Sequence, residues 1–95
     1  MSGGTFDGNQ YHIGQIADDI EHEIYHNYST ELNEWGDTIG NGYTEKTIDE
    51  LKTAVKVLRL AQIYAQRADY LFAGDDGEES FHTRLIAELK YLACI

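Results

Sequence analysis

The sequence contains no proline and only one cysteine, Cys94. A single cysteine excludes an internal disulfide and a zinc site built from several cysteines, and it agrees with a reducing compartment. We interpret Cys94 as a small apolar residue without a chemical role. Because proline is absent, the breaks between helices are expected at clusters of glycine.

Long apolar runs and basic residues are also scarce. No run approaches the roughly 18 residues that a membrane span requires, and the opening MSGGTFDGNQ lacks the charged and apolar regions of a signal peptide. We therefore expect a cytoplasmic protein without a membrane partner. Seventeen acidic residues against seven basic ones give a net charge of −10. This charge opposes direct nucleic-acid binding, which depends on neutralising phosphates, and it favours solubility and a basic partner surface.

The stretch from Thr47 to Ala73 contains 27 residues and no glycine. At 100° per residue its apolar side chains form two arcs, which together cover more than half of a helix circumference. Such a helix needs neighbours on two sides. We therefore predict an all-α fold, a small three-helix bundle with this long central helix. The first arc contains Ile48, Leu51, Ala54, Val55, Leu58 and Ala65, and the second contains Val57, Leu60, Ala61, Tyr64, Ala68, Leu71 and Phe72.

Two amphipathic helices are predicted beside the central one, within a single domain over residues 1–95. Residues 1–10 form a glycine-rich N-terminal arm, and residues 29–43 form a long connection between the first two helices. A chain this short buries only about 60 to 65% of its unfolded surface, so we expect a homo-oligomer. The first helix runs from about Tyr11 to Tyr28, with Ile13, Ile16, Ala17, Ile20, Ile24 and Tyr28 buried, and the third begins near Gly77, with Phe81, Leu85, Leu89 and Leu92 buried.

The connection from Ser29 to Tyr43 contains three glycines, and among its apolar residues are Trp35 and Ile39. We expect a short helical turn around Leu32 to Trp35. Large apolar side chains are usually buried, so we expect Trp35 and Ile39 to cover an open end of the core. The alternative is that they form a recognition surface.

Polar residues with capping chemistry precede the second and third helices. Thr44 or Thr47 can cap the second helix, and Gly74 can end it. In the acidic turn before the third helix, Asp76 and Glu79 form a capping-type pair at the positive end of the helix dipole. The template of a calcium-binding loop is absent, so we attribute the acids of this turn to helix capping.

The segment from His22 to His26 matches H-E-x-x-H, the helical motif in which two histidines bind zinc and the glutamate activates water. On the predicted helix the histidines lie opposite the buried isoleucines, and neither a third histidine nor the glycine-containing extension follows. We therefore interpret the match as a chance pattern that binds metal only adventitiously. No metal site, catalytic residue or cofactor is predicted.

Four of the seven basic residues, Lys52, Lys56, Arg59 and Arg67, share one sector of the predicted central helix, with Tyr70 beside them. Arginine makes bidentate contacts to phosphate, and an aromatic ring stacks on a base. The sector therefore suits a phosphate-bearing ligand with a base. The alternative is that it faces the acidic first helix, so that its charges pair within the fold or between subunits.

The chain opens with Ser2-Gly3-Gly4-Thr5-Phe6-Asp7, followed by Asn9-Gln10-Tyr11 and Ile16-Ala17-Asp18. It later carries Tyr64-Ala65-Gln66-Arg67, Asp69-Tyr70-Leu71, Gly74-Asp75-Asp76-Gly77-Glu78-Glu79-Ser80-Phe81-His82 and Arg84-Leu85. These segments resemble a family of short, mostly uncharacterised accessory proteins of tailed phages. The resemblance covers most of the chain and departs at Gly8 and His12, where we expect a tyrosine and an arginine.

The resemblance implies a phage protein that opposes host defence in the host cell cytoplasm, by binding rather than by catalysis. In the mechanism that we rank first, the protein acts as a sponge for a nucleotide second messenger of host immunity, of the cyclic or ADP-ribose type. The arm would close over the basic sector and form a pocket between subunits. The ligand-binding residues would be Gly3, Gly4, Phe6, Tyr11, Lys52, Lys56, Arg59, Arg67 and Tyr70.

A second mechanism uses the acidic surface instead. The protein would bind and inhibit a basic host defence protein, such as a CRISPR-Cas component or a nuclease, as DNA mimics and some anti-CRISPR proteins do. The net charge favours this mechanism, whereas the clustered basic residues and the glycine-aromatic arm favour the first.

Overall fold

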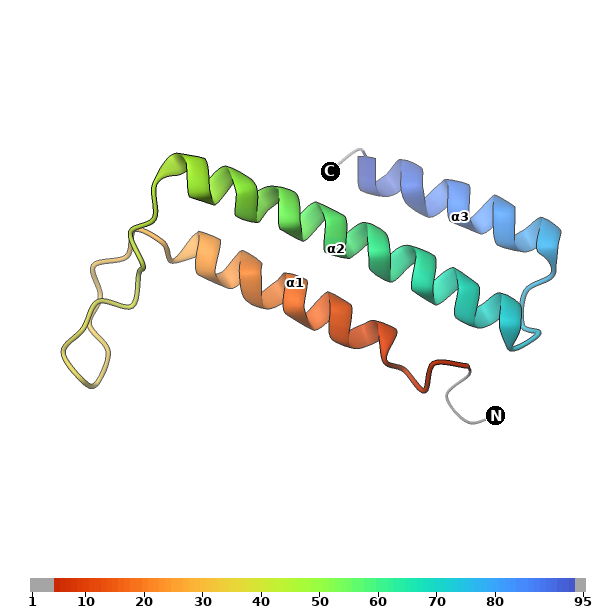
Figure 1. Cartoon of the computed structure of the whole chain (residues 1–95), viewed down its shortest axis with the longest axis horizontal. Helices are drawn as coiled ribbons and strands as arrows, with labels where there is room; N and C mark the ends of the chain where they lie inside the picture. Colours follow the sequence, from red (N-terminus) through yellow and green to blue (C-terminus); the bar gives the residue numbers. More distant parts are fainter. Residues whose placement is uncertain (1–4, 94–95) are drawn as a thin grey trace.

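The computed structural model describes residues 5–93 and contains three α-helices, with successive helices antiparallel (Figure 1). α1 spans Gln10–Tyr25, α2 spans Glu45–Phe72 and α3 spans Glu78–Ala93. The long helix α2 lies between α1 and α3, so the predicted all-α fold with three helices and a long central one is confirmed. Gly3 and Gly4 of the predicted arm, and Cys94, lie outside the described residues.

The ends of α2 follow from signals in the sequence. The hydroxyl of Thr44 accepts a hydrogen bond from the backbone N–H of Thr47 at 3.5 Å, so Thr44 rather than Thr47 is the cap. Beyond the other end, Gly74 has a φ of +84°, a conformation that closes helices and that residues with a side chain rarely adopt.

Helix α1 ends earlier than predicted, at Tyr25. The buried Asn27 is the physical reason, because its side chain binds the backbone of Tyr43 on the returning strand of the connection. The chain must leave the helical path to place this amide. Tyr28 therefore lies outside the helix and is exposed, so its predicted place in the buried stripe is wrong.

The interface between α1 and α2 is small and partly polar. Ala17 of α1 is fully buried, and Ile48 and Val55 of α2 complete the buried apolar residues of the described chain. On the other flank of α2, the predicted stripe of α3 is half-buried. The fold therefore has a narrow core on each side of α2 and no central core shared by all three helices.

One side of α2 has no neighbouring helix within residues 5–93. The helices lie side by side in the view down the shortest axis (Figure 1), and α1 and α3 each pack on α2 without packing on each other. Val57, Leu60, Tyr64 and Phe72 are consequently 40 to 65% exposed. These residues belong to the second apolar arc, which the sequence predicts to need a neighbour and which one copy of the chain leaves largely open.

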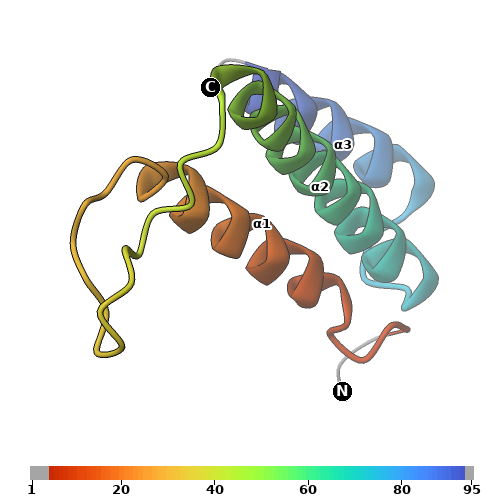
Figure 2. The ribbon, with the colours of Figure 1, turned by 60° about the vertical axis from the view of Figure 1, so that its left-hand side comes forward.

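The connection between α1 and α2 projects beyond the ends of both helices (Figures 1 and 2). We call residues 26–44 the projecting loop. It contains an antiparallel β-bridge between Leu32 and Thr38 in place of the predicted helical turn. Trp35 near its tip is 77% exposed and covers no core, so the first prediction for this residue is wrong.

Candidate functional site

A groove of about 550 Å³ lies beside α2, between α1 and the end of α3. It brings together three of the four cations of the predicted basic sector with an aromatic ring and several aliphatic side chains. Its lining residues are Glu21, Ile24 and Tyr25 of α1, Lys52, Val55, Lys56 and Arg59 of α2, and Leu92 of α3.

Arg59 joins α2 to the acidic side of α1. Its guanidinium donates to Asp18 Oδ1 at 2.7 Å and to the carboxylate of Glu21, and it also donates to the Gly14 carbonyl at 3.3 Å. The hydrogen bond to Asp18 raises the pKa of Arg59 against the opposing effect of burial, and Glu21 adds to the rise. A raised pKa means that this contribution to stability is present throughout the neutral range. For Arg59, the alternative prediction of pairing with the first helix is confirmed.

Lys52 and Lys56 are the cations of the groove that can meet a ligand. Both side chains are exposed, and neither forms an ion pair within residues 5–93. Tyr25 lies at the same groove and is 84% exposed. Two ammonium groups beside an exposed aromatic ring have the charge and the planar face that an anionic ligand with a planar group would use.

Arg67 lies outside this groove, and its charge is already neutralised. Its Nη1 lies 3.4 Å from Asp76 Oδ2, and its Nε lies 2.9 Å from Glu88 Oε1 at an angle too poor for a hydrogen bond. The guanidinium also stacks over the ring of Tyr70, 4.7 Å from its centroid. Arg67 is only 8% exposed, so its predicted role at a ligand gives way to a role in holding α3 on α2.

The described part of the N-terminal arm packs far from Lys52 and Lys56. The backbone N–H of Phe6 donates to Asp69 Oδ1 at 3.0 Å, and the ring of Phe6 meets Phe72 edge to face. Phe72 is 16 residues beyond Lys56, which corresponds to about 24 Å along the helix. Within one chain the described part of the arm, from Thr5 on, therefore does not close over the cations, and Phe6 and the exposed Tyr11 do not join the groove.

The histidines of the H-E-x-x-H segment stack on each other, with ring centroids 4.3 Å apart. Within residues 5–93, no group of three histidine, cysteine, aspartate or glutamate side chains is placed to hold a metal ion. His22 is exposed and His26 is half-buried beside Tyr25. Neither histidine lines the groove, so the geometry gives this histidine pair no role there.

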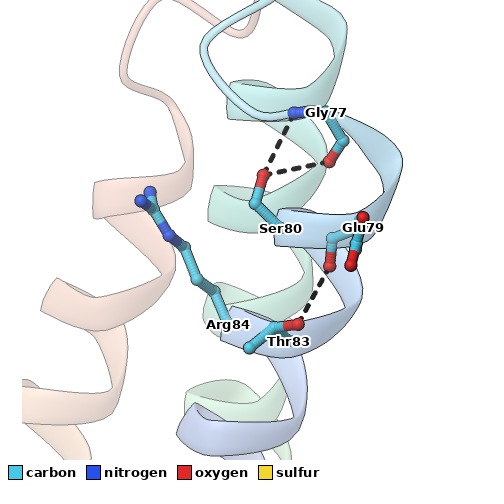
Figure 3. Close-up of a pocket in the computed structure, with 5 residues that line it drawn as sticks. All are labelled: Gly77, Glu79, Ser80, Thr83 and Arg84. Atoms are coloured by element: carbon cyan, nitrogen blue, oxygen red, sulfur yellow. Dashed lines mark hydrogen bonds between the residues drawn. The ribbon is translucent and has the colours of Figure 1, made fainter.

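A shallow pocket of about 440 Å³ lies at the start of α3 (Figure 3). The Ser80 hydroxyl accepts from the Gly77 N–H at 3.1 Å, and the Thr83 hydroxyl donates to the Glu79 carbonyl at 3.0 Å. Ser80, the third residue of α3, therefore binds back to the backbone of Gly77 just before the helix, whereas Asp76 is buried and binds Arg67 and Arg84. The prediction that every acid of this turn caps the helix is wrong for Asp76, because the tertiary fold brings two arginines to it.

Sequence reasoning missed the roles of three residues that shape the molecule: Tyr25 at the groove, Asn27 under the projecting loop and Asp76 between α2 and α3. Tyr25 lies four residues after Glu21, so both side chains lie on one face of α1. This spacing is the sequence signal that could have identified Tyr25. No local signal identifies the partners of Asn27 and Asp76, since these partners are fixed only when distant segments meet.

Comparison of the chain with protein-family models, with curated proteins and with solved structures gives no match. None of the helices within residues 5–93 combines the length and apolar character that crossing a membrane requires.

Proposed function

We propose that this protein acts by binding, without catalysis, and that it sequesters an anionic nucleotide signal of host immunity in the host cytoplasm. The groove with Lys52, Lys56 and Tyr25 carries the proposal. Its volume of about 550 Å³ lies in the range of small-molecule sites. The host-defence context rests on the resemblance of the sequence to phage accessory proteins, and the chemistry rests on the groove.

Different residues of the groove would contact different parts of such a ligand. Arg59 is fixed by Asp18 and Glu21 and orders the wall between α1 and α2. The ammonium groups of Lys52 and Lys56 supply charge for phosphates, and Tyr25 supplies a face for a base. Val55 and Leu92 provide an apolar floor that excludes water from one side of the ligand.

The open side of α2 supports the proposal that the protein is a homo-oligomer. From Thr53 to Phe72 this side carries apolar or hydroxyl side chains only, namely Thr53, Val57, Leu60, Ala61, Tyr64, Ala68, Leu71 and Phe72. Pairing it with the same side of a second copy buries large apolar side chains and leaves the acidic α1 outside. A second copy of the chain is a better occupant than an acidic or basic partner, because this surface offers no charge to either.

Native mass spectrometry with cyclic oligonucleotides and ADP-ribose derivatives tests both proposals. We expect a multimeric mass that rises stoichiometrically with one ligand class. Replacing Lys52 and Lys56 with alanine is expected to weaken binding at least about tenfold, because each lysine supplies a hydrogen bond from a charged group. Lys90→Ala is the matched control, since this exposed lysine lies on α3 outside the groove.

Equal binding by the double variant and by Lys90→Ala would remove the groove as the nucleotide site. An unchanged mass across the whole panel would remove the sponge function. A mass equal to that of a single chain would rule out the proposed homo-oligomer.

A second candidate function is binding to a basic protein, which the loop end of the molecule favours. Exposed carboxylates gather there, namely Glu23, Glu31, Glu34, Asp37, Glu45, Asp49 and Glu50. Selection from a displayed random-peptide library tests this function. Enrichment of lysine and arginine in the bound peptides, with binding that weakens as salt rises, is the expected result. Peptides without a basic bias would remove the candidate.

A further inference from the structure

The projecting loop exposes an unusual amount of apolar surface for a segment of 19 residues. Tyr28, Leu32 and Trp35 are each at least 65% exposed, and Tyr43 at its base is 45% exposed. Single exposed apolar residues are ordinary, but several in one small segment mark an interaction site. None of these side chains covers the core of the described chain.

Hydrogen bonds hold the tip of the loop in one conformation. The backbone N–H of Asn33 donates to the Asp37 carbonyl at 2.7 Å, and the Asn33 side-chain oxygen accepts from the N–H groups of Trp35 and Asp37 at 2.8 and 3.1 Å. The N–H of Ile39 donates to the Glu31 carbonyl at 2.9 Å. Trp35 therefore lies on a hydrogen-bonded turn rather than on a segment without internal hydrogen bonds.

Hydrogen bonds also join the two sides of the loop at its base. The Asn27 side chain, in a residue only 1% exposed, donates to the Tyr43 carbonyl at 3.0 Å and accepts from the Tyr43 N–H at 2.9 Å. Gly40 lies so close to the backbone of residues 26–29 that a Cβ there would meet the Asn27 carbonyl at 2.6 Å. These contacts join the two strands of the loop where they leave the helices.

Order of this kind lowers the entropy that the loop loses when it binds a partner. Tryptophan and tyrosine are the residues that most often dominate the binding energy of protein interfaces. A hydrogen-bonded support that presents an exposed tryptophan, with no packing role within residues 5–93, is therefore the arrangement of a recognition element.

The charge of the loop specifies the partner. Glu31, Glu34 and Asp37 alternate with the apolar side chains, and residues 27–45 contain no lysine or arginine. We propose that the projecting loop binds a protein surface that has an apolar recess for Trp35, with lysine or arginine residues around it. This inference rests on the second candidate function, names the surface responsible for it, and is independent of nucleotide binding in the groove.

The experiment uses the full chain and a displayed library of random peptides, with Trp35 itself as the probe. Trp35 is the single tryptophan, so its emission reports on the loop alone. We expect the selected peptides to combine basic residues with a bulky apolar one, and to shift the Trp35 emission to shorter wavelength. Trp35→Ala should weaken their binding at least about 30-fold, the loss expected of a hot-spot residue.

Tyr91→Ala is the matched control, because Tyr91 is an equally exposed aromatic residue on α3. This variant should bind the peptides as the parent does, and circular dichroism should show the same helix content in both variants. Basic peptides that bind Trp35→Ala as tightly as the parent would overturn the role of the loop and leave the second candidate function standing. A selection that yields only non-basic peptides, or none that depend on Trp35, would overturn the proposal.

Discussion

Replacing Asp76 with alanine is expected to lower the free energy of unfolding by about 3 to 5 kcal/mol, the cost of leaving one buried partner of an ion pair without the other. The Asp76 carboxylate is almost completely buried and lies 3.4 Å from Arg67 Nη1, and Arg67 is itself buried. Without Asp76, the Arg67 guanidinium keeps its charge, and the half-exposed Glu88 is its one remaining carboxylate partner within residues 5–93. At roughly 4 to 8 °C per kcal/mol for a domain of this size, thermal denaturation should show a large fall in Tm.

Arg84→Ala provides the control for Asp76→Ala. Arg84 donates to the same carboxylate at 3.0 Å, but its side chain is 60% exposed, so its loss should change the free energy of unfolding by about 0 to 1 kcal/mol. Replacing Arg67 with methionine and Asp76 with leucine together should recover much of the stability that Asp76→Ala loses, because an apolar pair often substitutes for a buried ion pair. Equal effects of Asp76→Ala and Arg84→Ala would contradict the buried-pair explanation.

Replacing Gly40 with alanine is expected to open the base of the projecting loop. The new Cβ would lie 2.5 Å from the His26 carbonyl oxygen and 2.8 Å from the Ser29 nitrogen. Both are backbone atoms that cannot rotate away, so the substitution should cost about 1 to 3 kcal/mol of unfolding free energy, as overpacking does in cores. Amide hydrogen exchange should show faster exchange at Gly42 and Tyr43, whose N–H groups donate to Asn27.

Gly77→Ala is the matched control for Gly40→Ala. Gly77 has an ordinary φ, and a Cβ there would meet no atom within 4 Å. Its substitution should leave the exchange of Gly42 and Tyr43 unchanged. Slow exchange at these two amides in the Gly40→Ala protein would show that the loop base adapts and that its rigidity does not depend on glycine.

Gly40→Ala and Trp35→Ala also distinguish nucleotide binding in the groove from partner binding by the projecting loop. Gly40→Ala acts at the loop base, away from Lys52 and Lys56, so it should weaken the peptides that depend on Trp35 and leave nucleotide binding in place. Trp35→Ala tests the same loop without disturbing its backbone. Agreement between these variants would connect the rigidity of the loop to its recognition of a partner.

Much of the secondary structure was predictable because its causes are local. The apolar arcs of α2, the cap at Thr44 and the left-handed glycine at Gly74 each act over one or two helical turns, and they place α2 within two residues of its predicted ends. The amphipathic stripe of α3 is likewise visible in its sequence. The end of α1 was missed because Asn27, which draws the chain out of the helix, acts on Tyr43, 16 residues away.

The candidate site was predictable only in part. Helical periodicity correctly placed Lys52, Lys56 and Arg59 on one side of α2, because residues on one helix keep their angular relation in any fold. Helical periodicity also placed Arg67 in that sector. Periodicity gives the direction of a side chain around the helix, but it does not identify the neighbouring segment that the side chain contacts. Asp76 and Glu88 reach Arg67, whereas Asp18 and Glu21 reach Arg59.

The sequence by itself determined that the chain is helical, that α2 starts after Thr44 or Thr47 and ends near Gly74, and that a second apolar arc of α2 needs a neighbour. These properties depend on the residues within a few turns of each other. Only the tertiary structure decided which acids neutralise which arginines, that one copy of the chain leaves the second arc open, and that Trp35 stands in solvent on a fastened loop. Each of these depends on which distant segments meet, and that is set by the packing of the three helices together.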